Sequence, residues 1–553
     1  MSWKLIQNAE RRLGRETALV RPSAGGDVRV ALGYPNTYFV GMSNLGLQVV
    51  YGFLNRIPGV SCERFFLPDP DELEEYEQCG RRLFTLESQR PVGEFDLVGF
   101  TLAYEPDYVH FLRMLELSGL KLKSSERGQD HPLVLVGGAL TLLNPEPIAD
   151  FVDVFCVGEA EGRVEELVEC MRRTRGQPRN QQLEAIAAIP GFYVPSLYRP
   201  LYEGGRFAGF EPPAAIAKTY ISADEFARQE THSLVLTEDT EFARSLLLEV
   251  SRGCPYVCRF CTVGFSYPKV RWKPLDRIWE AVERARAGGL DFQRVGLVSA
   301  TVGNHPDIAS LCERLRSNRI PVSFSSLRAD QLPDELLTAM VEGGTRSLTL
   351  APETGSEELR KAINKRFTDA QYYDAARRAF QAGIKKIKMY SMVGLPHERD
   401  HDIDALVELV KGTRALQKDA VVTLGLGIFV PKPLTPFQWA GMADTKLAEE
   451  RMKRVQKALA KVGGVRVNSE SPKVGLIEGL LARGDRRLGA VLLEVYRRPT
   501  FRGWLQALER CGLSLQELVY RQRDPGEPQP WDHLGASWSP ERLVRDLARS
   551  VRP

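Results

Sequence analysis

Three cysteines stand close together near the middle of the 553-residue chain. Cys254, Cys258 and Cys261 follow directly after residues 245–250, an apolar stretch with the pattern of a buried strand. A loop at the carboxyl end of a strand is not locked into helix or strand geometry, so it can wrap three thiolates round one corner of an iron–sulfur cluster. Three ligands for a four-iron cube leave one iron open, and an open iron can coordinate a substrate or a cofactor.

Two other interpretations of the cysteine group compete with this one. A structural zinc site takes four ligands, commonly as paired knuckles, and the next histidine and cysteine, His305 and Cys312, form no matching pair. The other alternative is a chance grouping of reduced, buried cysteines. The remaining cysteines lie singly in the sequence, and we interpret them as small hydrophobic residues: Cys62, Cys79, Cys156, Cys170, Cys312 and Cys511.

The CxxxCxxC spacing, with the aromatic Phe260 just before the third cysteine, resembles the signature of the radical S-adenosylmethionine (SAM) superfamily. The resemblance implies that Cys254, Cys258 and Cys261 hold a [4Fe–4S] cluster whose unique iron is chelated by the amino and carboxylate groups of SAM, with Phe260 beside the cofactors. It also implies a one-electron reductant of flavodoxin or ferredoxin type. Reduction would cleave SAM to methionine and a 5′-deoxyadenosyl radical, which abstracts hydrogen from a substrate.

Two segments downstream resemble elements that contact SAM in this family. Ser299 and Ala300 end the expected second strand, where many relatives carry a GGE-like motif; this sequence lacks those glycines, and the two backbones would hold the methionine amino group instead. Residues 325–330 resemble an SxR segment of the third strand. By that resemblance, Arg328 would meet the SAM carboxylate with bidentate geometry.

Two further segments extend the resemblance. Residues 351–365 resemble an E-[ST]-G-S segment that begins a helix after the fourth strand. Glu353 would accept hydrogen bonds from SAM, and Lys365 would lie about three turns along the following helix. Gly394 and Pro396 resemble the GxPxE turn that closes the fifth strand near adenine.

The elements that must position these residues alternate between strand and helix. Helical patterns separate six expected strands, which predict a partial parallel (β/α)6 barrel over residues 243–445 with its chemistry at the carboxyl ends of the strands. The expected strands are residues 245–250, 294–299, 321–326, 346–350, 385–393 and 421–430. Residues 191–242 are predicted to connect domains, and residues 446–553 to be mostly helical.

Residues 1–190 are predicted to form a doubly wound, Rossmann-like α/β domain, with strands at residues 28–35, 97–101, 133–138 and 152–158. This segment resembles a cobalamin-binding domain, and the resemblance places four residues at the cofactor: Asn44, Gly46, Gly137 and Gly138. The backbone of the last two could approach a macrocycle closely because no Cβ intervenes.

One motif of cobalamin proteins is missing from this segment. The DxHxxG motif, whose histidine ligates cobalt in many of them, is absent, and no histidine precedes His110. Two alternatives therefore stay open. Either cobalamin binds without a histidine ligand, or the domain keeps its fold without the cofactor.

Composition narrows the class of protein. The formal net charge of +3 is too small for this length to indicate nucleic acid as a partner. The first ten residues lack the apolar run of a signal peptide, and no stretch of about 18 apolar residues predicts a membrane span. A cytoplasmic protein is expected.

The chain as a whole resembles radical SAM proteins with a cobalamin-binding domain. The leading hypothesis is a cobalamin-dependent methyltransferase that acts on an unactivated carbon. The alternatives are a radical SAM enzyme that modifies RNA or protein and keeps a vestigial cobalamin domain, and a non-enzymatic iron–sulfur module for electron transfer. The substrate is not indicated by the sequence, because fold and cofactor fix the radical source and not its target.

Overall fold

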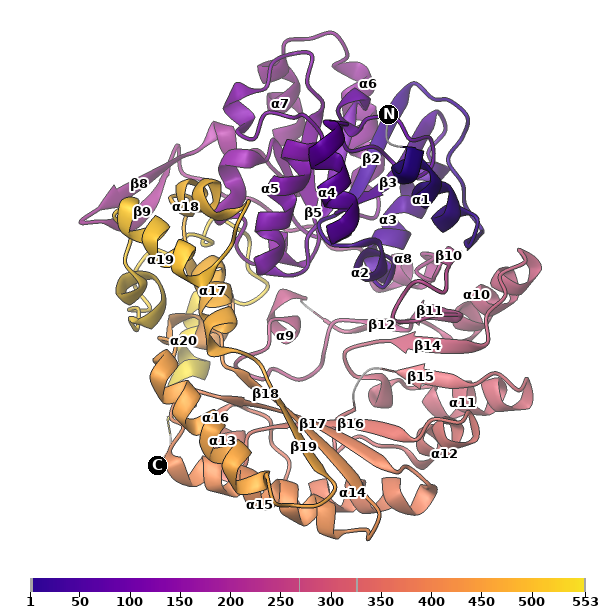
Figure 1. The fold of residues 1–553 in the computed structure, drawn as a ribbon, viewed down its shortest axis with the longest axis vertical. Helices are drawn as coiled ribbons and strands as arrows, with labels where there is room; N and C mark the ends of the chain where they lie inside the picture. Colours follow the sequence, from indigo (N-terminus) through magenta and orange to yellow (C-terminus); the bar gives the residue numbers. More distant parts are fainter. Residues whose placement is uncertain (1–2, 268, 325–326, 552–553) are drawn as a thin grey trace.

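The N-terminal sheet domain faces a barrel-like sheet, and C-terminal helices lie against both (Figure 1). The computed structural model describes residues 3–267, 269–324 and 327–551. Across these residues, no helix has both the length and the apolar character that crossing a bilayer requires.

The N-terminal sheet has the strand order β3-β2-β4-β5-β6-β7, in which β7 alone is antiparallel to its neighbour. Its strands are β2 (Val28–Tyr34), β3 (Val60–Phe66), β4 (Leu97–Thr101), β5 (Leu133–Gly137), β6 (Val154–Cys156) and β7 (Phe192–Tyr193). The strand order reverses at β2, which is the switch point where doubly wound sheets bind ligands. The predicted doubly wound fold is confirmed, and β3 and β7 are additional to the predicted strands.

Helices cover the sheet, and their apolar faces supply its core. They are α1 (Trp3–Leu13), α2 (Tyr38–Met42), α3 (Leu45–Arg56), α4 (Pro70–Cys79), α5 (Tyr108–Leu117), α6 (Arg163–Arg173) and α7 (Arg179–Ala187). The side chain of Asn44 caps α3, since its Oδ1 accepts a hydrogen bond from the Leu47 amide at 3.0 Å. Asn44, which was predicted to contact a cofactor, therefore fixes the first turn of α3.

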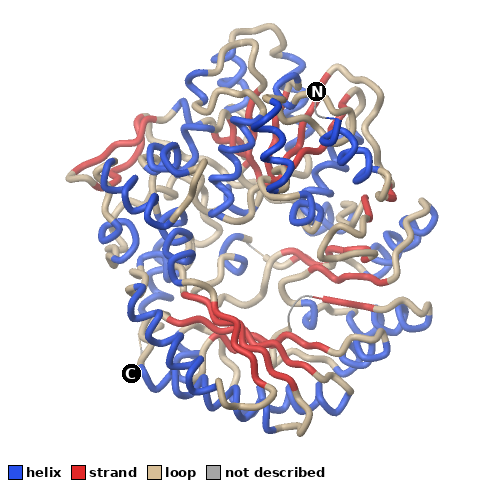
Figure 2. Tube along the Cα trace, viewed as in Figure 1, coloured by secondary structure: helices blue, strands red, loops and turns tan. Residues whose placement is uncertain are grey.

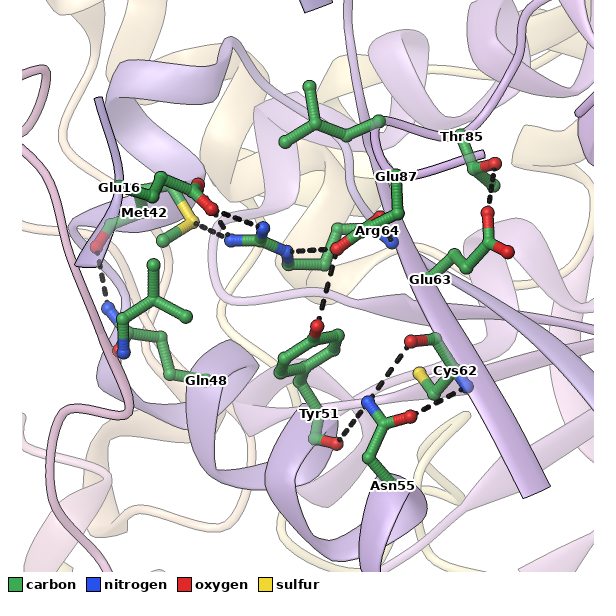
Figure 3. Close-up of polar contacts among 12 residues, drawn as sticks. Glu16, Met42, Gln48, Tyr51, Asn55, Cys62, Glu63, Arg64, Thr85 and Glu87 are labelled. Atoms are coloured by element: carbon green, nitrogen blue, oxygen red, sulfur yellow. Dashed lines mark hydrogen bonds and ion pairs between the residues drawn. The ribbon is translucent and has the colours of Figure 1, made fainter. Parts of the chain in front are cut away.

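A buried arginine explains why β3 escaped prediction. Arg64 breaks the apolar pattern of this strand, yet its side chain is buried. Its guanidinium lies 2.7 Å from Glu16 and 2.7 Å from Glu87, and it stacks on the Tyr51 ring at 5.0 Å (Figure 3). These contacts satisfy the buried charge and tie two loops to the strand.

The second sheet is a partial barrel of parallel strands in two pieces, shown as strands in Figure 2. The pieces have the orders β11-β14-β15 and β16-β17-β18-β19, and the pairing of Leu327 with Leu350 joins them. The strands are β11 (Ser245–Glu249), β14 (Arg294–Val298), β15 (Val322–Phe324), β16 (Ser347–Glu353), β17 (Lys386–Val393), β18 (Val421–Ile428) and β19 (Val465–Ser469). Six were predicted; β19 is a seventh, in the segment expected to be mostly helical.

Helices follow the barrel strands and pack on the outside of the sheet, as Figure 1 shows for α14 and α15. They are α10 (Leu275–Ala287), α11 (Ile308–Ser317), α12 (Asp334–Glu342), α13 (Glu357–Ala362), α14 (Asp369–Ala382), α15 (Asp400–Ala415) and α16 (Thr445–Leu459). The C-terminal helices are α17 (Pro472–Arg483), α18 (Leu488–Val495), α19 (Phe501–Arg510) and α20 (Pro540–Ala548).

Residues 191–242 contain the hairpin of β8 (Arg199–Glu203) and β9 (Arg206–Glu211), the helix α8 (Ala223–Arg228) and the short strand β10 (Val235–Leu236). Strand β10 pairs with β1 (Thr17–Ala18), so this segment runs back across the N-terminal domain.

Polar contacts join the N-terminal domain to the rest of the molecule. Lys432, beyond the end of β18, lies 2.5 Å from Glu105, beyond the end of β4. Arg486, in the turn before α18, lies 2.9 Å from Glu146. The carboxyl edge of the N-terminal sheet therefore lies against the exits of the barrel strands.

Candidate functional site

The cysteines occupy a loop that a small hairpin closes. Strands β12 (Ser251–Arg252) and β13 (Arg271–Trp272) pair antiparallel at its base, and α9 (Val263–Ser266) lies within it. Gly253 adopts φ +90°, a conformation that favours glycine, where the chain leaves β12 for Cys254. The sequence thus folds into a closed loop at the carboxyl end of the first barrel strand, as predicted.

The electrostatics of the loop disfavour free thiolates. Burial raises the pKa of all three thiols, to about 11 for Cys258, and each is raised further by the charge of another cysteine of the group. The structure thus brings Cys254, Cys258 and Cys261 together. A bound metal centre would favour the thiolate form of these cysteines, because metal ligation deprotonates a thiol.

The arrangement of donors distinguishes two kinds of centre. Among the described residues, no three His, Cys, Asp or Glu side chains converge tightly enough to hold one metal ion. A zinc ion needs its thiolates round a single point, whereas a four-iron cube takes each thiolate on a different iron. The donors that the loop offers, three thiols and no histidine, are compatible with such a cube.

Arg259, which sequence reasoning missed, anchors the cysteine loop. Its buried guanidinium donates to the carbonyl of Ala362 at 2.6 Å and to Asp546 of α20 at 3.0 Å. Its backbone amide donates to Ile363 at 3.0 Å, and Asn364 Nδ2 donates to the loop carbonyl of Val257 at 2.9 Å. The loop is thus fixed to the end of α13 and to the last helix.

Phe260 packs against a small apolar cluster. The cluster contains Leu359 and Ile363 of the α13 segment, Leu395 of the Gly-Leu-Pro turn, and Phe429 beyond β18. Phe260 therefore joins the cysteine loop to two of the segments predicted to contact SAM.

Glu353 and Lys365 form an ion pair beside the cysteines. Lys365 Nζ lies 2.6 Å from Glu353 Oε1, and both side chains act on the pKa of Cys258, which Lys365 lowers and Glu353 raises. The prediction that Lys365 sits three turns along a helix was wrong. Helix α13 ends at Ala362, and Asn364, at φ +58°, turns the chain back toward the cysteine loop.

The backbone at Glu353 is held in an unusual conformation. Glu353 ends β16 at φ +66°, a region that non-glycine residues rarely adopt. The buried Arg360 fixes the turn by donating to the carbonyls of Thr354 and Gly355, each at 3.1 Å. A Cβ at Gly355 would lie 1.9 Å from the Leu406 amide nitrogen, so only glycine fits there. Together these contacts fix the backbone of Glu353, whose carboxylate raises the pKa of Cys258 and Cys261.

Arg328 also lies at the cysteine group. Its guanidinium stacks 3.7 Å from the centre of the Tyr256 ring, and its Nη1 is 3.9 Å from Cys258 Sγ. Its Nε and Nη2 each donate to Asp330 at 2.9 Å, so the bidentate partner in this structure is Asp330. Of the SxR segment, Ser325 and Ser326 lie outside the described residues.

The second barrel strand, β14, ends beside the β12–β13 hairpin. Ser299 Oγ is 2.6 Å from Ser251 Oγ and accepts from the Thr301 amide at 3.0 Å, whereas Ala300 is exposed. These contacts place the Ser299 and Ala300 backbone next to the strand that leads into the cysteine loop.

The Gly-Leu-Pro turn contains a buried carboxyl. Gly394 adopts φ +82° and its amide donates to Glu398 Oε2 at 2.7 Å, with Pro396 between them in the turn. Arg451 lies 2.6 Å from the same oxygen, and the Glu398 side chain is 1% exposed. Burial raises the pKa of Glu398 to about 7, against the opposing effects of the Gly394 amide and Arg451.

This carboxyl predicts a pH dependence of stability. Because the pKa is higher in the folded than in the unfolded state, the folded protein binds more protons between pH 4.5 and 7. The free energy of unfolding should therefore fall as the pH rises through this window, by about 1–3 kcal/mol. Denaturant unfolding at pH 5 and pH 7.5 should show that Glu398→Gln removes this fall. If the free energy of unfolding of Glu398→Gln still differed between the two pH values as it does in the wild type, the pH dependence would belong to other groups.

A cavity lies in the N-terminal domain between α3, α6 and strands β2, β4 and β5, and encloses about 1070 Å³, part of it open to solvent. It sits at the switch point, and three predicted residues, Gly46, Gly137 and Gly138, line it. The adjacent Gly137 and Gly138 differ in the space available for a side chain. A Cβ at Gly138 would meet the Leu102 carbonyl at 2.4 Å, whereas one at Gly137 would have its nearest neighbour at 3.8 Å.

The cavity also reaches the cysteine loop. Arg252 of β12 and Tyr267, just beyond α9, line it together with Glu159 and Glu161, which follow β6. Arg252 precedes Cys254 by two positions. The cavity therefore extends to the base of the cysteine loop.

Two known proteins are similar to this chain in sequence. A protein of Methanocaldococcus jannaschii, the uncharacterized protein MJ0966, is 29% identical over 90% of this chain and 97% of its own length. A tRNA-2-methylthio-N(6)-dimethylallyladenosine synthase of Anoxybacillus flavithermus is 23% identical over 45% of this chain. The match spans about half (48%) of the length of that relative.

A solved structure shares the fold. The radical S-adenosylmethionine methyltransferase TsrM from Kitasatospora setae, with cobalamin and a [4Fe–4S] cluster bound, superposes with a TM-score of 0.50 at 14% identity. The match covers 88% of this chain and 99% of that one.

Two family models match successive parts of the chain. Residues 46–195 match the N-terminal region of radical SAM proteins, and residues 248–410, which include the cysteine loop, match the radical SAM superfamily. The chain therefore belongs to the radical SAM superfamily.

Proposed function

We propose that this radical SAM enzyme holds a [4Fe–4S] cluster on Cys254, Cys258 and Cys261, and that it binds SAM at the cluster and cobalamin in the N-terminal cavity. The reaction we propose is methyl transfer to an unactivated carbon. The observation that supports the proposal is that Arg252 and Tyr267, at the base of the cysteine loop, line the N-terminal cavity. The bound state of TsrM, whose fold this chain shares, agrees with it.

The chain's own residues have distinct tasks in this proposal. The cluster supplies the electron that cleaves SAM, and cobalamin carries the methyl group. Glu353 and Arg328, both at the cysteines, bind the polar groups of SAM, and the Gly394–Pro396 turn lies at its adenine. The apolar residues of the cavity exclude water, as the linings of ligand pockets do.

Cofactor analysis tests this proposal. Protein purified without oxygen should contain iron, sulfide and cobalamin together. With a reductant it should convert SAM to 5′-deoxyadenosine and to S-adenosylhomocysteine, the second product appearing only if methyl is transferred. A full cluster without SAM cleavage would leave the electron-transfer module as the function.

RNA modification is the second candidate, because the Anoxybacillus relative is a tRNA-modifying enzyme. In that case the N-terminal domain would recognise substrate and the cavity would bind no cobalamin. SAM cleavage by protein that shows no corrin absorption would favour it.

Gly137 offers a direct test of the cavity. Replacing Gly137 with valine should leave the fold intact, since a Cβ there meets nothing closer than 3.8 Å, and should abolish cobalamin binding by filling the cavity. Corrin absorption retained after gel filtration measures the binding. Gly128→Val, in open space on the same domain, is the matched control. Cobalamin bound equally by both variants would place the cofactor elsewhere.

A further inference from the structure

A buried network of carboxylates and arginines joins the N-terminal domain to the cysteine loop. Arg252 lies 3.2 Å from Glu159, 2.8 Å from Glu161 and 2.8 Å from Glu249. Arg271, opposite Arg252 in the β12–β13 hairpin, donates to Glu159 at 2.8 Å. The two glutamates of the N-terminal domain thus grip both strands of the hairpin that closes the cysteine loop.

The connecting segment completes this joint. Phe226 of α8 is fully buried, and the Arg252 and Arg271 guanidiniums lie 5.1 and 5.7 Å from its ring. The Ile221 amide donates to Glu159 at 2.8 Å. Three parts of the chain, the N-terminal domain, the connecting segment and the barrel, therefore meet at these side chains.

The burial of the joint makes it stiff. The side chains of Glu159 and Glu161 are each 4% exposed, and that of Arg252 is 13% exposed. Separating a buried ion pair leaves uncompensated charges, which costs far more than breaking a surface pair. A movement of the hairpin that broke these contacts would therefore lower the stability of the protein considerably.

The same side chains form a wall of the cavity. Glu159, Glu161 and Arg252 line it, and only Gly253 separates Arg252 from Cys254. An occupant of the cavity therefore touches the group that sets the position of the first cysteine. A loop ordered by the cluster, in turn, fixes the cavity wall.

We propose that Arg252, held by Glu159 and Glu161, couples the cavity to the cysteine loop, so that cobalamin binding and cluster assembly favour each other. This inference rests on the proposed function, in which the cavity binds cobalamin. Arg252 is a positioning residue here, since it acts through the loop. Coupling between two sites is reciprocal, so the cluster must strengthen cobalamin binding by the factor by which cobalamin strengthens cluster retention.

The experiment measures hydroxocobalamin affinity by absorbance, without oxygen, for protein with a reconstituted cluster and for chelator-stripped protein. The wild type should bind about tenfold more tightly with the cluster, within the range usual for coupled sites. Arg252→Lys keeps the charge but loses the two guanidinium nitrogens that contact Glu159 and Glu161 separately. It should bring the ratio of the affinities with and without the cluster toward one. Glu161→Gln, which removes a single contact, should lower the ratio less.

Glu146→Gln is the matched control, because Glu146 pairs with Arg486 across another domain contact and does not line the cavity. It should keep the wild-type ratio. A wild-type ratio of one, or a ratio unchanged in both Arg252→Lys and Glu161→Gln, would overturn the inference while leaving cobalamin binding intact. A ratio lost in Glu146→Gln as well would also overturn it, since any domain contact would then suffice. Wild-type protein that binds no cobalamin in either state would overturn the proposed cofactor and the inference together.

Discussion

Replacing Cys258 with alanine should abolish SAM cleavage and most of the bound iron. Cys258 is the most buried of the three cysteines, and its sulfur lies within reach of Arg328. Loss of Cys258 removes one of the three proposed ligands, and the segment from Cys254 to Cys261 contains no further cysteine and no histidine. Changes beyond the ligands of a metal site already cost about 10–100-fold, so loss of a ligand should cost more.

The measurement combines iron and sulfide content, the absorption of the reconstituted cluster, and 5′-deoxyadenosine formed with a chemical reductant. Cys312→Ala is the matched control, because Cys312 is also buried in the barrel domain but lies on α11. It should retain both iron and SAM cleavage at some cost in stability. Wild-type iron content and SAM cleavage in Cys258→Ala would contradict the cluster assignment.

The sequence predicted the elements whose signal is local. Apolar strands such as Val28–Tyr34 and Lys386–Val393 were found because each is a short apolar stretch, and helical patterns separate such stretches along the chain. The cysteine loop was found because three thiols within eight positions of a long chain are typical of a metal centre. Strand Val60–Phe66 was missed because Arg64 interrupts its apolar run, and the partners that satisfy this arginine in the core, Glu16 and Glu87, lie outside the strand.

The missed parts of the site depend on contacts between distant residues. Arg259 reaches Asp546, 287 positions away, and Arg252 reaches Glu161 in another domain. Neither pairing leaves a spacing pattern in the sequence. Glu159 and Glu161 follow β6, and their arginine partners Arg252 and Arg271 lie about 100 positions later, in another domain. Lys365 was assigned to a helix because the sequence does not show that Asn364 reverses the chain.

The ion pair between Glu353 and Lys365 leads to the second large effect. Glu353→Gln should weaken SAM binding about 10–100-fold, which corresponds to the loss of one hydrogen bond to a charged group. The glutamine keeps the shape of the side chain but not its charge, and it leaves the buried Lys365 without its partner at 2.6 Å. Equilibrium dialysis with labelled SAM on cluster-loaded protein measures the change. Glu342→Gln is the control and should bind SAM normally, because Glu342 is an exposed carboxyl at the end of α12 that pairs with Arg316.

A double-mutant cycle separates contact with SAM from support of the turn. If Glu353 binds SAM itself, Lys365→Met should weaken binding less than Glu353→Gln, and adding Lys365→Met to Glu353→Gln should not restore it. If the glutamate only neutralises Lys365, the double variant should bind SAM as well as Lys365→Met does. The conformation at Glu353 favours the first result. A non-glycine residue at φ +66°, fixed by a fully buried arginine, is held in a strained conformation that the surrounding contacts maintain, as side chains at ligand sites often are.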